Sequence, residues 1–259
     1  LLTGALAIPW IGAAIIALCG QSPNLREGVT LLCSTVLFSF VFALTFLVLS
    51  GEGVRLEIFE VFPGATIAFS TEPLGLVFAL VASLLWILTS LYSIGYMRAH
   101  NEANQTRFYA FFAIALACAT GVTLADNMLT LFLAYELLTL STYPLVTHTG
   151  DNRSMRAGRT YLGILLGTSL GLQLLAIIWT WQIAGTLDFR VGGILEDKVS
   201  GFMAGILLFL YVYGIGKAAL MPLHQWLPAA MVAPAPVSAL LHAVAVVKVG
   251  VFTILKVVI

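Results

Sequence analysis

The feature that most constrains the fold is a succession of long apolar segments separated by short polar gaps. A helix needs roughly 20 apolar residues to cross the hydrocarbon core of a bilayer, and several segments reach that length. Hydrophobic residues make up 60% of the chain and charged residues 9%. The sequence therefore predicts an all-α polytopic transmembrane helix bundle with about eight crossings. The expected crossings are Leu1–Gly20, Val29–Leu49, Leu74–Tyr96, Phe108–Leu124, Met128–Thr147, Tyr161–Ile183, Phe202–Leu220 and Val237–Ile259.

The polar gaps are too short to form a soluble domain, so residues 1–259 are expected to form a single transmembrane domain. The stretch VRLEIFEVFPGATIAFS, residues 54–70, alternates apolar and polar residues and breaks at Pro-Gly. This pattern predicts a short hairpin outside the membrane, with an interfacial amphipathic segment as the alternative. The first apolar run lacks a charged start and is followed by further spans, which argues against a cleaved signal peptide.

Charge placement is more informative than charge total. Twelve basic residues balance twelve acidic ones, so nothing favours nucleic acid as a partner. Arginines concentrate in the gaps after the first, third and fifth crossings, which predicts that these gaps are cytoplasmic and the amino terminus is outside. The basic residues of these gaps are Arg26, Arg98, Arg107, Arg153, Arg156 and Arg159, against Arg55, Arg190 and Lys198 in the gaps after the second, fourth and sixth crossings.

Glu136 and Lys217 are ionisable residues inside apolar runs. Such groups are costly at membrane depth unless paired or hydrated, which makes them candidates for an ion pathway. Glu136 lies nine residues beyond Asn127, about 14 Å along a helix, and is expected near mid-membrane. Lys217 follows two glycines and precedes Pro222, a pattern that predicts a broken helix around the lysine. The alternatives are a protonated glutamate that hydrogen-bonds between helices and a lysine that snorkels to an interface.

Three further groups follow along the same stretch. His242 and Lys248 are expected on one helix, six residues and about 9 Å apart, a gap that water could bridge. His242 has an alternative role as a packing partner between helices. His224 is either an interfacial anchor or a proton uptake group. Lys256 is a weaker candidate, because snorkelling to the surface explains it equally well.

No cofactor or metal site is expected. The three cysteines are scattered without metal-ligand spacing, and the chain has neither a glycine-rich nucleotide loop nor histidines at haem spacing. Any redox chemistry is expected in partner subunits.

Several ordered motifs resemble a known family. KAALMPLHQWLPAAM followed by PAPVSALLHA, together with LFLAYELLTLSTYPLV around Glu136 and the stretch from Thr71 to Met97, is similar to the antiporter-like proton-translocating subunits. This family is shared by respiratory complex I, membrane-bound hydrogenases and multisubunit Na+/H+ antiporters. HAVAVVKVG and AYELL are most similar to the D-type subunits of these antiporters. Ala229 and Ala235 depart from the pattern, which usually has aspartate and threonine there.

The resemblance implies an inverted-repeat fold with one broken, lysine-bearing helix in each five-helix repeat. Residues 1–100 would hold the amino-terminal helices and hairpin, residues 107–259 the first repeat, and the second repeat would be absent because the chain is a fragment. It also implies a proton relay through Glu136, Lys217, His242 and Lys248. Protons would load Lys217 from the cytoplasmic side and reach Lys248 through water and His242, gated by a Glu136–Lys217 ion pair.

The expected function is proton translocation in a Na+/H+ antiporter subunit of the inner (plasma) membrane. The expected partners are other membrane subunits, the lipid bilayer, protons and Na+. A proton-pumping subunit of complex I or of a hydrogenase is the first alternative, in which the enzymatic chemistry belongs to the host complex. A non-transporting scaffold subunit and a carrier of an organic solute are the remaining alternatives.

Overall fold

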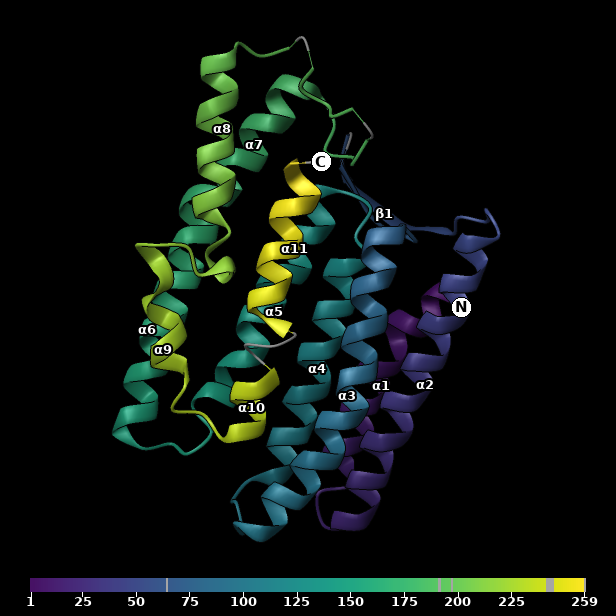
Figure 1. Ribbon diagram of the computed structural model, residues 1–259, viewed down its shortest axis with the longest axis vertical. Helices are drawn as coiled ribbons and strands as arrows, with labels where there is room; N and C mark the ends of the chain where they lie inside the picture. Colours follow the sequence, from purple (N-terminus) through teal and green to yellow (C-terminus); the bar gives the residue numbers. More distant parts are fainter. Residues whose placement is uncertain (64, 191, 197, 241–244, 259) are drawn as a thin grey trace.

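The computed structural model describes residues 1–63, 65–190, 192–196, 198–240 and 245–258. It is an elongated helical bundle with a small hairpin toward one end (Figure 1), and 74% of it is helical. The predicted helical membrane bundle is confirmed. The elements are α1 Leu2–Leu18, α2 Pro23–Leu49, β1 Arg55–Phe62, β2 Ala65–Ser70, α3 Pro73–Ala99, α4 Gln105–Thr123, α5 Met128–Val146, α6 Asn152–Thr168, η1 Ser169–Gln173, α7 Leu174–Ala184, α8 Gly201–Gly214, η2 Gly216–Ala218, η3 Leu223–Gln225, α9 Trp226–Ala230, α10 Ala235–Leu240 and α11 Val247–Val258.

Helix α4 occupies the middle of the bundle. Figure 1 shows α1–α3 on one side and α6–α9 on the other, with α4, α5 and α11 between them. The most apolar stretch of α4 is 78% buried, whereas that of α2 is 22% buried. Alanines allow α4 to occupy this central position, because small side chains let neighbouring helices approach closely. Ala113, Ala115, Ala117 and Ala119 are all buried.

Five helices of the described chain are long and apolar enough to cross a membrane: α2, α3, α4, α5 and the continuous helix Asn152–Ala184. The last of these joins α6, the π-helical turn η1 and α7. It starts earlier than the predicted Tyr161, because the Asp151 carboxylate caps the helix by accepting a hydrogen bond from the Ser154 amide at 2.9 Å. The apolar helices α1 and α8 are shorter.

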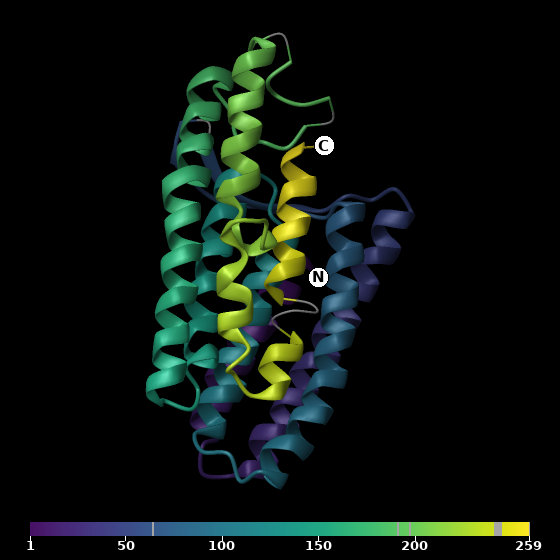
Figure 2. The same cartoon turned by 60° about the vertical axis from the view of Figure 1, so that its left-hand side comes forward.

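The last two predicted crossings are interrupted. Helix α8 ends at Gly214, so the expected continuous run to Leu220 is wrong, while the predicted break near Lys217 is confirmed. The expected single helix Val237–Ile259 is also wrong, because Val246 lies in a bend and α11 begins only at Val247. Figure 2 shows α10 and α11 as two separate segments. His242 lies outside the described residues.

The predicted hairpin is confirmed. Strands β1 and β2 pair antiparallel, with Arg55 opposite Ser70. Backbone bonds dock β2 onto the turn between α4 and α5: the Ser70 amide donates to the Leu124 carbonyl at 2.8 Å and the Asp126 amide to the Ala68 carbonyl at 3.0 Å.

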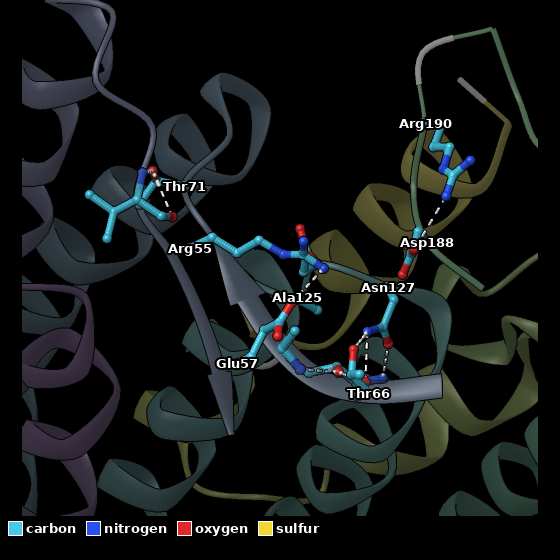
Figure 3. A network of polar contacts seen from close by, with 12 residues as sticks. Arg55, Glu57, Thr66, Thr71, Ala125, Asn127, Asp188 and Arg190 are labelled. Atoms are coloured by element: carbon cyan, nitrogen blue, oxygen red, sulfur yellow. Dashed lines mark hydrogen bonds and ion pairs between the residues drawn. The ribbon is translucent and has the colours of Figure 1, made fainter. Parts of the chain in front are cut away.

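A third segment completes this end of the molecule through a bridge between Asn127 and Asp188. We call β2, residues 124–127 and residues 187–189 the platform. Figure 3 shows the side-chain bonds around it, including the Asn127 amide that donates to the Thr66 carbonyl at 2.7 Å. Arg55 also pairs with Asp126 across the platform at 2.7 Å. The platform therefore ties the hairpin to the ends of α4 and α5.

Candidate functional site

The helix break at Lys217 is enclosed by neighbouring backbone. A Cβ atom on Gly214 would lie 2.4 Å from the Gln173 amide nitrogen, and one on Gly216 would lie 2.2 Å from the Thr168 hydroxyl. The two glycines therefore allow the broken segment to pack directly against α6 and η1. The Gly216 carbonyl accepts hydrogen bonds from the Trp226 indole at 2.9 Å and from the Ala219 amide at 3.0 Å. Broken backbone at membrane depth needs protein partners of this kind.

The Lys217 side chain is completely buried, at 0% exposure. Its ammonium donates to the Tyr135 carbonyl at 2.8 Å and to the Thr139 hydroxyl at 2.5 Å. It also lies 3.1 Å from the centroid of the Tyr135 ring. The Lys217 backbone amide donates to the Tyr135 hydroxyl at 3.0 Å. One face of α5 thus holds both the ammonium and the backbone of the break with neutral groups.

Glu136 lies beside this face but does not hold the ammonium. Both side chains lie in the described part of the chain, and they form no ion pair within 4.0 Å. Among the described residues, neither Glu136 carboxyl oxygen has a hydrogen-bond partner, although both atoms are buried. The expected Glu136–Lys217 ion pair is therefore absent from this structure. The physical reason is helical geometry: Tyr135 and Thr139 share a face, and Glu136 is turned about 100° away from Tyr135.

A second set of contacts braces the break. The Thr142 and Tyr161 hydroxyls are 2.5 Å apart and join α5 to α6. The Tyr161 ring then packs edge-on against Trp226, with centroids 5.6 Å apart. Trp226 is fully buried, so this contact lies inside the protein. His224 lies in η3 and is half-buried, and its role stays a prediction.

Helix α11 touches the break through a glycine. A Cβ atom on Gly250 would lie 2.3 Å from the Ala218 amide nitrogen and 2.5 Å from the Lys217 carbonyl carbon. Lys248 stands two residues earlier but is exposed in the described chain. It lines a mostly apolar cavity of 310 Å³ whose opposite wall is α3, at Val77 and Val81. The structure thus brings the backbone of α11 to Lys217, but not the Lys248 ammonium.

The Lys256 side chain does not extend to the surface of the protein, as a snorkelling lysine would. Its side chain is 4% exposed and forms an ion pair with Glu72 at 3.0 Å. The ammonium also donates to the Ala125 carbonyl and lies 4.7 Å from the Phe189 ring centroid. It is therefore enclosed by protein.

Sequence reasoning found the buried lysines but missed their partners, which are neutral groups around Lys217 and a carboxylate at Lys256. Tyr135, Thr139, Tyr161 and Glu72 carry no separate signal in an apolar helix or at a helix start. Their spacing offers one clue, because Tyr135 and Thr139 stand four residues apart on either side of Glu136.

Residues 125–259 match the family model described as NADH:quinone oxidoreductase/Mrp antiporter, TM. The chain belongs to this family. It is 28% identical to the NADH-quinone oxidoreductase subunit L of Campylobacter jejuni, over 94% of the chain and 41% of that protein. It is 34% identical to hydrogenase-4 component B of Escherichia coli, over 76% of the chain and 29% of that protein. It is 30% identical to a putative antiporter subunit mnhA2 of Staphylococcus aureus, over 71% of the chain and 23% of that protein. The chain spans less than half the length of these relatives.

Two solved complexes show the same fold. The archaeal membrane-bound sulfane sulfur reductase matches with a TM-score of 0.84 at 21% identity, over 98% of the chain and 52% of the matched one. The Mrp complex from Dietzia matches with a TM-score of 0.83 at 26% identity, over 97% of the chain and 27% of the matched one. The resemblance to antiporter-like subunits is confirmed. The chain is a membrane-integral member of the family, and the relatives are subunits of multisubunit membrane complexes.

Proposed function

We propose that the chain is the proton-translocating part of a membrane subunit in a multisubunit Na+/H+ antiporter. The observation that carries this proposal is the Lys217 ammonium, which is completely buried at a helix break and held by the neutral groups of Tyr135 and Thr139. A buried charge of this kind is costly, so an ionisable residue at this depth favours a role in ion movement over one in packing.

The contacts around Lys217 support a two-position gate. In this structure the ammonium occupies the site formed by the Tyr135 carbonyl and the Thr139 hydroxyl. Glu136 is their neighbour on α5, and its carboxyl oxygens are without hydrogen-bond partners among the described residues. We infer that a change of side-chain rotamer carries the ammonium to Glu136. Contact with the carboxylate stabilises the charged lysine, and separation removes that stabilisation, so movement between the two positions controls proton loading.

The next step in the proposal leads to α11. Close packing of Gly250 on the break keeps this helix against Lys217. The proton would pass through water and His242 to Lys248, with His224 as the uptake group. Moving protons against a gradient requires an energy input from a partner complex or a counter-ion gradient. This input must change the relative free energies of the two positions of the Lys217 ammonium.

The test is proton flux through the full-length subunit in its assembled complex, reconstituted in vesicles with a pH-sensitive dye. Lys217→Ala is expected to abolish flux, because it removes the group that carries the proton. The matched control is Lys198→Ala, since Lys198 is an exposed lysine whose ammonium donates to the Ala184 carbonyl, far from Lys217 in the sequence. Flux retained by Lys217→Ala would instead support the scaffold alternative.

A proton-pumping subunit of a redox complex is a second candidate. The match to the Campylobacter protein named NADH-quinone oxidoreductase subunit L, over 94% of this chain, favours it. The two candidates differ in their energy source. Na+-driven proton flux without a redox substrate would support the antiporter, whereas flux that appears only on addition of NADH or a reduced electron donor would support the redox pump.

A further inference from the structure

Lys256 joins three elements at the end of the bundle that carries the hairpin. It lies on α11, and its partners are Glu72 directly before α3 and Ala125 in the turn between α4 and α5. Figure 1 shows that the carboxyl end of α11 reaches this region. Ala125 belongs to the platform, where it bridges to Phe69 of β2, and Figure 3 shows its position there. One ammonium thus connects α11 to two separately anchored parts of the molecule.

The Lys256 ammonium is largely shielded from water, so its contacts with protein groups determine where it lies. Its side chain is 4% exposed, whereas that of Glu72 is 36% exposed. Both residues line a cavity of 690 Å³ that also contains Asp188 and Arg190. Water in this cavity reaches Glu72 more readily than Lys256. Loss of Glu72 would leave a buried ammonium unpaired, whereas loss of Lys256 would leave a carboxylate that is 36% exposed. The ion pair therefore favours this position of α11 chiefly through the cost of an unpaired Lys256.

Helix α11 needs such a contact because it is short. Its residues Val247–Val258 rise only about 18 Å. A bend at Val246 precedes it, so it does not continue an α10 helix that could hold it. The described contacts hold it at three levels: Gly250 against the Lys217 break, Phe252 against Phe78 of α3 with ring centroids 5.3 Å apart, and Lys256 against Glu72 and Ala125. The first and last of these levels are six residues apart, about 9 Å along the axis.

We infer that Lys256 and Glu72 are positioning residues for the relay, and this inference rests on the proposed function. Their ion pair sets the height and rotation of α11 against α3 and the platform. It thereby keeps Lys248, eight residues away on the same helix, at a fixed distance from the break. Lys256 itself does not carry the transported proton.

The experiment measures the position of α11 and proton flux separately, in the full-length subunit within its complex. Nitroxide labels are attached to cysteines at Val77 on α3 and Leu255 on α11, after Cys19, Cys33 and Cys118 are replaced by serine. Val77 and Leu255 are 60% and 43% exposed in the described chain and line the same cavity as Lys248. The distance distribution between the labels reports how α11 lies against α3.

Lys256→Met and Glu72→Gln are each expected to broaden or shift this distribution and to lower proton flux by about tenfold or more. Glu72→Gln leaves a buried ammonium unpaired, and Lys256→Met removes the contacts that join α11 to Glu72 and Ala125. The double variant is expected to be no worse than the more severe single one, since the two residues act as a pair. Lys256→Arg is expected to keep the narrow distribution and most of the flux. Lys198→Met, an exposed lysine change, is the control.

Two results would overturn the inference. One is a wild-type distance distribution in both Lys256→Met and Glu72→Gln. The other is a wild-type distribution but no flux in Lys256→Arg, which would identify Lys256 as a proton carrier, because arginine keeps its proton. The label distances do not depend on transport. A failure of the proposed function, seen as flux in Lys217→Ala, is therefore distinguishable from a failure of this inference.

Discussion

At the scale of single residues, the decisive point is that Lys217 is solvated by α5 and not neutralised by it. A carbonyl and a hydroxyl replace water around the ammonium, while the nearest carboxylate on the same helix stays out of contact. This arrangement gives the ammonium a resting site next to a stronger partner. The energy difference between the two positions then depends on Thr139 as well as on Glu136.

Thr139→Val tests this dependence, because valine has nearly the same shape but cannot accept a hydrogen bond. A hydrogen bond to a charged group contributes about 1.5–3 kcal/mol, so its loss should shift the ammonium toward Glu136 and reduce proton flux about tenfold. The dye assay in vesicles measures the effect. Thr160→Val is the control, since Thr160 is exposed and its hydroxyl donates to the Arg156 carbonyl within α6. Unchanged flux in Thr139→Val would contradict the two-position gate.

The residue scale also shows what sequence can predict. Glu136 and Lys217 stand out because charge is rare in apolar runs. The structure places Glu136 on α5 and Lys217 at the helix break that packs against α5. Tyr135 and Thr139 do not stand out, because a hydroxyl in an apolar helix normally bonds its own backbone. Their role depends on which helix approaches α5, and this is a tertiary property that spacing along one helix does not contain.

At the scale of elements, glycines decide where helices touch. The approach of α11 to the Lys217 break has no room for a side chain at Gly250, since the neighbouring atoms belong to backbone.

The ends of two helices differ from those predicted from hydropathy. Hydropathy alone merged α8 with the break and α10 with α11, because the residues across each interruption remain apolar. Helix α8 ends because its hydrogen-bond ladder stops at Gly214, and hydropathy does not measure hydrogen bonding.

Gly250→Ala is expected to abolish most proton flux. Its Cβ would lie 2.3 Å from a backbone nitrogen, so α11 or the break must move. Thermal unfolding and flux, measured on the same preparation, separate displacement from failure to fold. Gly205→Ala on α8, where a Cβ would meet open space, is the matched control. Wild-type flux in Gly250→Ala would show that the close contact has no part in transport.

The start of α6 gives a prediction with a defined pH dependence. Hydrogen bonds from Ser154, followed by one from the Thr149 hydroxyl, lower the pKa of the Asp151 carboxyl below its ordinary value of 3.8. A lowered pKa means that the ionised cap stabilises the helix above that value, and that this contribution is lost as pH falls through the folded pKa. Amide hydrogen exchange at residues 152–156 should therefore accelerate under acid, and Asp151→Ala should show the fast exchange already at neutral pH. Equal exchange in both proteins at neutral pH would rule out the cap.

At the scale of the whole molecule, the placement of charges predicts an orientation in the membrane. The first turns of α6 contain three arginines and are expected on the cytoplasmic side, whereas the hairpin is expected outside. Single cysteines at Glu57 and at Arg153 in a cysteine-free background test this. A membrane-impermeant maleimide should label position 57 in intact cells and position 153 only after permeabilisation. The reverse pattern would invert the topology and place proton uptake on the other side.

The contrast between α4 and α2 has a consequence for how this protein changes over evolutionary time. Helix α4 is largely surrounded by protein, and its alanines are buried among neighbouring helices. Helix α2 presents residues such as Leu32 and Phe46, at 64% and 59% exposure, to the surroundings of the chain. Any apolar residue suits lipid, so α2 should drift freely among descendants, whereas α4 should accept few replacements.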